Sequence, residues 1–465
     1  MNWNKRDYAE DASISVLERL SYTCGNAGNC IGLTVISMFM LFYYTDILGI
    51  SAGAIATIML VSRIFDGVTD IFMGYIVDRT HSPKGKARVW VLRGSIPYTL
   101  AVIGIFFVPS GANDMFQYIY IFVLYNLANA VFGTVVNTSY NSMNSLITKN
   151  AYETGVLGIF GMVGATIAST FVGSYALKII NLFGEGERAW HLGITVIALI
   201  GLLLLLICYG GVRERVIESE DEKENPLPIR VVLKNLSQNK YWLMVGISYI
   251  FIMFFGGTYT NSLLYYCKGV LGDTSYQTAI VNMTNIPQLI ATICSAFFVK
   301  KIGKGNTFRL GNIILIIGLA LRAIVGANPQ MQIFCGLLYG AGYGMVLSEI
   351  LGLLADTVEY GLWKNGVRIV GSAFAVMSFA AKIGNGFGSS VVGWMLEWSG
   401  YNGDAAVQNS QAIFSINACF IYIPLICAIL MLVVMSFYDL DKKFEQIIED
   451  NKNRAEKKKA SEPIA

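Results

Sequence analysis

Two aspartates four residues apart, Asp66 and Asp70, lie inside an apolar stretch of the chain, and Arg63 precedes Asp66 by one helical turn. In a helix this spacing puts both carboxylates on one face. Two carboxylates that close do not both ionise in a dry site unless a cation lies between them or one is protonated. The pair therefore predicts a site for a coupling cation: Na⁺ or Li⁺ held by both carboxylates, or H⁺ carried by one. A structural ion pair of Arg63 with Asp66, beside a solvated Asp70, is the alternative.

Two further charges lie within apolar runs, Lys382 in SAFAVMSFAAKIGNGFG and Glu349 in MVLSEILG. An ionisable group at the centre of a bilayer costs at least ~2.5–3.5 kcal/mol, so each is a functional candidate. We expect Lys382 to be a counter-charge for the aspartates; a lysine reaching the membrane surface is the alternative. Glu349 is expected to bind a sugar hydroxyl or to pair with Lys382, unless it packs as a hydrogen-bonded acid. Asp356 and Glu359 are expected to form ion pairs with Arg368 or with the central loop.

The composition indicates which elements position these residues. Of the 465 residues, 54% are hydrophobic and 14% are charged, whereas soluble domains carry about 25% charged residues. The net charge of +3 is too balanced for a nucleic-acid partner, and eight scattered cysteines with two histidines indicate neither a disulfide framework nor a metal site. Apolar spans of membrane length are predicted at about 20–46, 52–77, 90–109, 116–146, 156–180, 189–211, 241–266, 275–299, 307–326, 330–355, 369–398 and 411–437.

The distribution of basic residues predicts the orientation of these twelve spans. Lysines and arginines near the membrane are retained on the cytoplasmic side. With the amino terminus inside, the basic loops after spans two and eight, the central stretch and the basic tail all fall on the cytoplasmic side. The outer loops then keep only Lys178, Arg188 and Lys268. We therefore expect a multi-pass protein of the cell (inner) membrane, in contact with lipid, with both termini in the cytoplasm.

A weak internal repeat divides the chain. MLFYYTDILG at the end of span one resembles LLYYCKGVLG at the end of span seven, and DRTHSPKGK after span two corresponds to KKIGKGN after span eight. Two six-helix halves around a central substrate site are the arrangement of major-facilitator transporters. The predicted fold is thus an all-α integral membrane protein with halves at 1–211 and 241–437, a central cytoplasmic loop at 212–240 and a tail at 438–465. A channel or a membrane enzyme would not predict this repeat.

At these residues the chain resembles the glycoside–pentoside–hexuronide/cation symporters, over nearly its whole length. The most specific match starts at Asp70 and continues through Gly74 and Asp78 to the run GKARVW at 85–90, where the family prefers Phe and Pro in place of Ala87 and Val89. LSYTCGNAG and LFYYTDILGIS in span one, RIFDGVTD in span two, and DTVEYG followed by Lys382 support the match.

The resemblance implies that Asp66 and Asp70 hold the coupling cation with Thr134 as a neighbour, and that Lys382 matches the family's span-eleven lysine. At the positions of the family's sugar site, which carry acidic, aromatic and guanidinium groups, this chain has Cys30, Asn137, Asn141 and about Met162. We therefore do not expect acidic and guanidinium side chains to hydrogen-bond galactoside hydroxyls in this chain.

Nearby polar residues remain candidates for binding a sugar. They share amide or hydroxyl groups that donate and accept hydrogen bonds, and they are Asn26, Asn29, Asn137, Tyr140 and Asn141. Tyr22 or Tyr140 could stack on a pyranose face. The alternative for each amide is packing between helices.

The expected function is symport of a sugar (a glycoside, oligosaccharide, pentoside or hexuronide) with Na⁺ or H⁺. The chain is expected to act as a monomer, without an enzymatic reaction, a cofactor or nucleic acid. Two alternatives stay open: a uniporter or exporter of another small solute on the same fold, and a sugar sensor that no longer transports.

Overall fold

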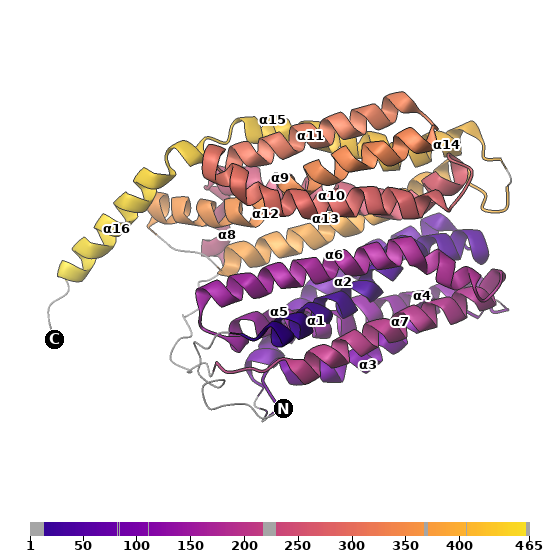
Figure 1. Cartoon of the computed structure of the whole chain (residues 1–465), viewed down its shortest axis with the longest axis horizontal. Helices are drawn as coiled ribbons and strands as arrows, with labels where there is room; N and C mark the ends of the chain where they lie inside the picture. Colours follow the sequence, from indigo (N-terminus) through magenta and orange to yellow (C-terminus); the bar gives the residue numbers. More distant parts are fainter. Residues whose placement is uncertain are drawn as a thin grey trace. The chain divides into compact units, whose positions relative to one another are not determined.

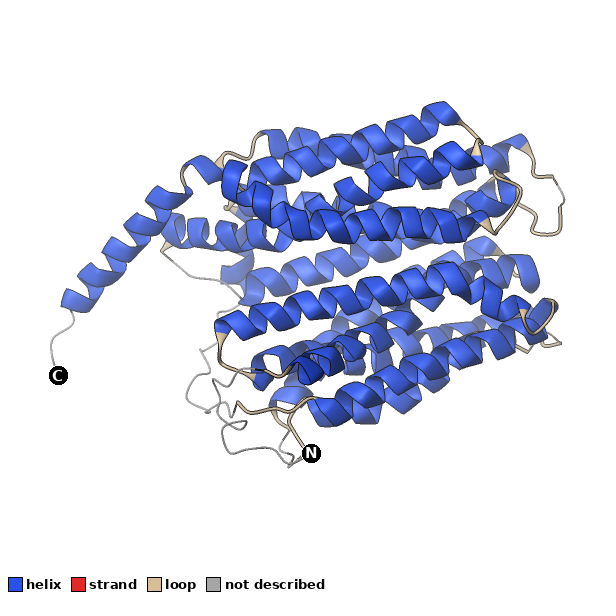
Figure 2. Cartoon of the chain, in the orientation of Figure 1, coloured by secondary structure: helices blue, strands red, loops and turns tan. Residues whose placement is uncertain are grey.

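The computed structural model describes residues 14–80, 82, 84–109, 111–216, 229–366, 371–405 and 407–461. Every regular element within these residues is helical (Figure 2), which confirms the all-α prediction. Some helical positions are described by their backbone alone, and Asp70 is one of them.

The amino-terminal part of the chain forms six long helical segments (Figure 1). The first and the fourth are interrupted by π-helical turns, labelled η. In chain order the elements are α1 (Val16–Val35), η2 (Ile36–Met40), η3 (Tyr43–Ile47), α2 (Ala52–Asp78), α3 (Arg88–Ile105), α4 (Asp114–Asn126), η4 (Leu127–Gly133), α5 (Thr134–Ile147), α6 (Ala151–Asn181) and α7 (Gly186–Gly211).

The carboxy-terminal part forms six more long segments and short helices at its borders. These elements are α8 (Ile229–Ser237), α9 (Lys240–Gly269), α10 (Tyr276–Ile302), α11 (Lys304–Val325), α12 (Pro329–Asn365), α13 (Gly371–Trp398), α14 (Ser410–Asn417), the π-helical turn η6 (Ala418–Tyr422), α15 (Ile423–Ser436), the 3₁₀ helix η7 (Leu440–Lys442) and α16 (Phe444–Ser461). In the described residues, the long segments coincide with the twelve predicted spans.

Within the described residues, eight segments are long and apolar enough to cross a membrane by length and composition. A further stretch of α2, Ala52–Arg63, is apolar but shorter. It ends directly before the part of the helix that carries Asp66. The length and apolar character of these segments agree with the predicted multi-pass arrangement.

The chain divides into two compact units. The first combines the described part of residues 1–223 with 260–282 and 389–417, and the second combines the described part of 224–259 with 283–388 and 418–461. In the first unit, α1 packs against α6 and α7. A side chain at Gly28 of α1 would lie 2.6 Å from the Gly201 carbonyl oxygen of α7, so a small residue is required for the two backbones to approach.

The repeat in the sequence has a structural counterpart at the start of the third helix of each half. In the first unit the Glu214 carboxylate accepts hydrogen bonds from the backbone N–H groups of Lys86, Ala87 and Arg88 at 2.5, 3.0 and 2.5 Å. In the second unit the Asp441 carboxylate accepts one from Gly305 N–H at 2.8 Å. Each acid follows the sixth helix of its half and binds the positive end of the third.

Candidate functional site

Asp66 is buried in the first unit, with 5% of its surface exposed. Thr134 Oγ1 of α5 donates a hydrogen bond to Asp66 Oδ1 at 3.2 Å. Arg63 Nη1, one turn away on α2, lies 3.3 Å from Asp66 Oδ2. One buried carboxylate thus has a hydroxyl and a guanidinium on its two oxygens. The side chain of Asp70 lies outside the described part of the structure, so its share in a cation site stays a prediction.

A π-helical turn places Thr134 opposite Asp66. The fourth span changes from α4 to η4 and back to α5, and Thr134 is the first residue after η4. Thr134 Oγ1 also lies 3.4 Å from the Asn129 carbonyl oxygen of that turn. π-Helical turns inside α-helices are rare and occur frequently at functional sites. The Asn129 carbonyl is therefore a part of the site that the sequence pattern did not single out, because a π-helical turn has no distinct residue signature.

Five of the predicted sugar-binding residues lie in one polar cluster between α1, α5 and α6. Asn29 Nδ2 donates to Asn137 Oδ1 at 3.2 Å, and Asn141 Nδ2 donates to the same oxygen at 3.4 Å. Asn26 Nδ2 donates to the Gly161 carbonyl of α6 at 2.9 Å. The Cys30 thiol lies 3.6 Å from Asn26 Oδ1. We call this set, completed by Tyr140, the amide cluster.

Tyr140 stacks on Tyr22, with ring centroids 4.5 Å apart and an angle of 25° between the rings. One face of each ring is thus covered by the other ring, which leaves less aromatic surface for a pyranose than the sequence suggested. Asn29 Oδ1, in contrast, has an unused hydrogen-bonding capacity among the described residues. It is buried without a hydrogen-bond partner among the described residues, and a buried acceptor of this kind is suited to a ligand hydroxyl.

The carboxylate and the amide cluster share one helix. Thr134 and Asn137 are three residues apart on α5, so they lie on the same helical face. A movement of α5 that alters the Thr134–Asp66 contact also moves the acceptor oxygen of Asn137. Helix α5 thereby joins the residues of the predicted cation site to those of the predicted sugar site.

The remaining predicted residues belong to the second unit. Glu349 is buried and accepts a hydrogen bond from Ser348 Oγ at 3.2 Å, and Ser348 Oγ lies 3.0 Å from Ser295 Oγ. These bonds agree with the hydrogen-bonded packing that stood as its alternative, and a role of Glu349 in sugar binding stays a prediction. Lys382 is half-buried on α13. Its predicted role towards Asp66 stays a prediction.

The predicted ion pair of Asp356 with Arg368 stays a prediction, because Arg368 lies outside the described residues. Among the described residues, the Asp356 carboxylate lies 2.7 Å from Lys304 Nζ at the start of α11. The partner found in the structure comes from the helix that packs beside α12.

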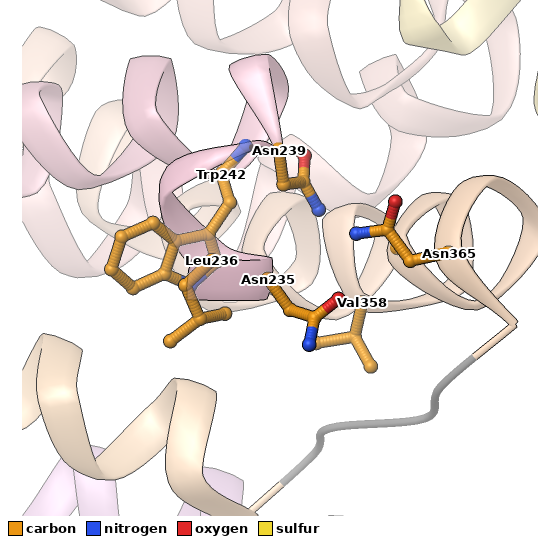
Figure 3. A pocket seen from close by; sticks show the side chains of 7 residues that line it. Asn235, Leu236, Asn239, Trp242, Val358 and Asn365 are labelled. Carbon is orange, nitrogen blue, oxygen red and sulfur yellow. Dashed lines mark hydrogen bonds between the residues drawn. The ribbon is translucent and has the colours of Figure 1, made fainter. Parts of the chain in front are cut away.

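A pocket at one end of the second unit is too small for a sugar. It is lined by residues of α8, α9 and α12, among them Trp242 and Val358, and by Asn239, which lies between α8 and α9 (Figure 3). Its volume is ≈ 10 Å³, which is room for about one water molecule. Asn239 Nδ2 donates to the Thr357 carbonyl at 2.7 Å. This hydrogen bond joins the link between α8 and α9 to α12.

Comparisons with known proteins identify the family. The family model described as MFS/sugar transport protein matches residues 21–442. The isoprimeverose transporter of Lactiplantibacillus pentosus is 30% identical over 443 residues, covering 93% of this chain and 90% of that protein. The inner membrane symporter YicJ of Escherichia coli (strain K12) is 30% identical over 429 residues, covering 91% of this chain and 92% of that protein.

The fold is also that of solved transporters. The crystal structure of a D-xylose–proton symporter matches with a TM-score of 0.63 at 16% identity, over 89% of this chain and 96% of that chain. These findings confirm the major-facilitator fold and the resemblance stated above. The chain therefore belongs to the family of MFS/sugar transport proteins, the glycoside–pentoside–hexuronide symporters of the major facilitator type, and it is a membrane transporter and not an enzyme.

Proposed function

We propose that this transporter carries a glycoside, oligosaccharide, pentoside or hexuronide across the cell membrane together with Na⁺ or H⁺, Asp66 and Asp70 holding the cation. The relatives named isoprimeverose transporter and inner membrane symporter support a sugar substrate, symport and the inner membrane. The single observation that carries the proposal is the buried Asp66 carboxylate, which contacts Thr134 one helical turn from the amide cluster.

The mechanism follows from linkage between two sites. A bound cation lowers the repulsion between Asp66 and Asp70 and holds Thr134, which positions α5 and the Asn137 acceptor for sugar hydroxyls. Because coupling between two binding sites is reciprocal, the sugar then raises the affinity for the cation by the same factor. Arg63 and Lys382 supply the positive charge that the aspartates require when no cation is bound. The carrier acts as a monomer with both termini in the cytoplasm.

The test is uptake by the reconstituted protein. Proteoliposomes would be given an inward Na⁺ gradient, an inward H⁺ gradient or neither, with radiolabelled isoprimeverose and a panel of pentosides and hexuronides outside. We expect one gradient to drive accumulation, and Asp66→Asn to abolish accumulation. Asp114→Asn, which removes an exposed acid at the start of α4, is the matched control and should transport normally. Accumulation that needs neither gradient, or that survives Asp66→Asn unchanged, would contradict the proposal.

A further inference from the structure

Lys268, one of the few basic residues in the predicted outer loops, forms an ion pair with Asp46. Lys268 Nζ lies 2.5 Å from Asp46 Oδ1 and donates to the Gly403 carbonyl at 2.8 Å. Tyr401 donates to the same Asp46 oxygen at 2.8 Å. The Asp46 side chain is 1% exposed and the Lys268 side chain 32%. A buried carboxylate is thus held by an ammonium and a phenol from two other segments of the first unit.

Asp46 and Lys268 occupy matching positions in the internal repeat. When Tyr43-Tyr44 is aligned with Tyr265-Tyr266, Asp46 falls opposite Lys268. The glycines that end the two repeat segments, Gly49 and Gly272, fall one position apart in this register. Both have positive φ, 67° and 80°, so the backbone turns three residues after Asp46 and four residues after Lys268. One repeat supplies the acid and the other supplies the base, and the two contact each other in the structure.

Two further contacts in the first unit join helices of the two repeats, and they correspond to each other under the same repeat. The Glu397 carboxylate of α13 accepts hydrogen bonds from Ser51 Oγ and Gly53 N–H at the start of α2, at 3.1 and 3.2 Å. Ser174 Oγ of α6 donates to Asn282 Oδ1 of α10 at 3.0 Å. The first contact joins spans two and eleven and the second joins spans five and eight. Under the repeat, span two corresponds to span eight and span five corresponds to span eleven. The two contacts are therefore equivalent to each other. Spans one and seven correspond to each other, so the Asp46–Lys268 contact is equivalent to itself.

We propose that Asp46 and Lys268, with Tyr401, form the latch that closes the outer end of the transport path. The proposal rests on the proposed function in one respect, that the two repeats move against each other during transport. Asp46 belongs to the first repeat and Lys268 to the second, so the ion pair joins the two repeats and has to break before these two segments can separate. Breaking it must therefore accompany the opening that admits the solute.

The chemistry of the latch suits a contact that forms and breaks repeatedly. Lys268 keeps a third of its side chain exposed, so its ammonium regains water when the pair separates. A fully buried pair would oppose opening more strongly, because removing one partner from a buried charge is costly. A purely apolar contact would not fix the two segments in one orientation, because apolar contacts are non-directional. The Asp46–Lys268 pair lies between these extremes.

The experiment measures access to the amide cluster from outside. In a variant that keeps Cys30 as its single cysteine, the rate of Cys30 labelling by a membrane-impermeant maleimide is followed in right-side-out and inside-out vesicles. Four further variants share this background: Asp46→Asn, Lys268→Gln, the exchange Asp46→Lys/Lys268→Asp, and Asp273→Asn. The last removes an exposed outer-loop acid that contacts Ser275 and is the matched control. Thermal unfolding of each purified variant checks that it folds.

We expect each single latch variant to raise the labelling rate from the outer side roughly 3- to 10-fold, a shift of about 1 kcal/mol towards the open state. The exchanged variant should label at a rate close to the unmodified latch, and Asp273→Asn should not differ from it. Folded single variants that label no faster than the parent would overturn the latch. Labelling needs neither sugar nor gradient, so a wild-type protein that fails to accumulate any sugar would contradict the proposed function and leave this result standing.

Discussion

The hydroxyl of Thr134 donates a hydrogen bond to Asp66 Oδ1 across 3.2 Å and so joins α5 to α2 at a buried carboxylate. Three residues further along α5, Asn137 accepts a hydrogen bond within the amide cluster. If a cation takes the place of the Thr134–Asp66 hydrogen bond, the hydroxyl keeps its proton and turns it towards the Asn129 carbonyl. The threonine oxygen then becomes a ligand of the cation, since hydroxyl and carboxylate oxygens both suit hard cations. The helix that carries the amide cluster then also carries a ligand of the cation.

Replacing Thr134 should therefore weaken the cation site without removing its charge. Thr134→Ala is expected to raise the cation concentration for half-maximal uptake by roughly 10-fold, because a hydrogen bond to a charged group contributes about 1.5–3 kcal/mol. Thr134→Ser keeps the hydroxyl and should stay close to wild type. The measurement is sugar uptake as a function of cation concentration. Equal behaviour of the Ala and Ser variants would show that the hydroxyl has no part in cation binding.

Asn137 is the acceptor for two other amides, Asn29 at 3.2 Å and Asn141 at 3.4 Å. Asn137→Ala leaves both donors without this acceptor, so the amide cluster loses its arrangement. We expect the KM for sugar to rise by roughly 10-fold, about 1.4 kcal/mol, with little change in cation affinity. Ser145→Ala, at an exposed position on the same helix, is the control. A KM that stays unchanged in Asn137→Ala would assign the cluster to helix packing instead.

The sequence indicated the buried acid Asp66, but it did not indicate which groups hydrogen-bond to one another around the site. Asp66 was found because an acid inside an apolar span is costly and therefore conspicuous. The bond from Asn26 to the Gly161 carbonyl was not predictable, because a backbone acceptor carries no residue signature. The Lys304 partner of Asp356 lies 52 positions away, and only the packing of α11 on α12 brings the two together. Residue type thus indicates where a charge matters, and tertiary packing decides what it contacts.

The carboxylates at the starts of α3 and α11 should differ in their contribution to stability. Glu214 accepts three backbone hydrogen bonds and Asp441 accepts one. Because an anion at a helix start is stabilising by up to ~2 kcal/mol, Glu214→Gln should lower the free energy of unfolding by about 1–2 kcal/mol and Asp441→Asn by less. Thermal unfolding in detergent measures both, with Asp404→Asn, at an exposed loop position, as the control. A larger loss in Asp441→Asn would contradict this ranking.

Arg322, near the end of α11, is a buried cation with no hydrogen-bonded acceptor in the part of the chain that the structure describes. It is 0% exposed, and among the described residues none of its three side-chain nitrogens has a hydrogen-bond partner. Its guanidinium lies 5.4, 5.5 and 4.8 Å from the ring centroids of Tyr259, Tyr339 and Phe420. Each such contact contributes ~0.5–2 kcal/mol, which offsets the several kcal/mol that burying an ion costs.

These opposing terms predict that Arg322→Met changes the free energy of unfolding by less than about 1 kcal/mol, since an apolar side chain of similar length keeps the packing and removes the desolvation cost. Arg322→Lys should be less stable than both, because an ammonium is more strongly hydrated and stacks less well on rings. Arg309→Met is the matched comparison on the same helix. Its guanidinium donates to the Met435 and Tyr438 carbonyls, so losing it should cost about 1–3 kcal/mol. If Arg322→Met unfolds as readily as Arg309→Met, the aromatic contacts of Arg322 contribute more than its desolvation costs, and the guanidinium itself is required at this position.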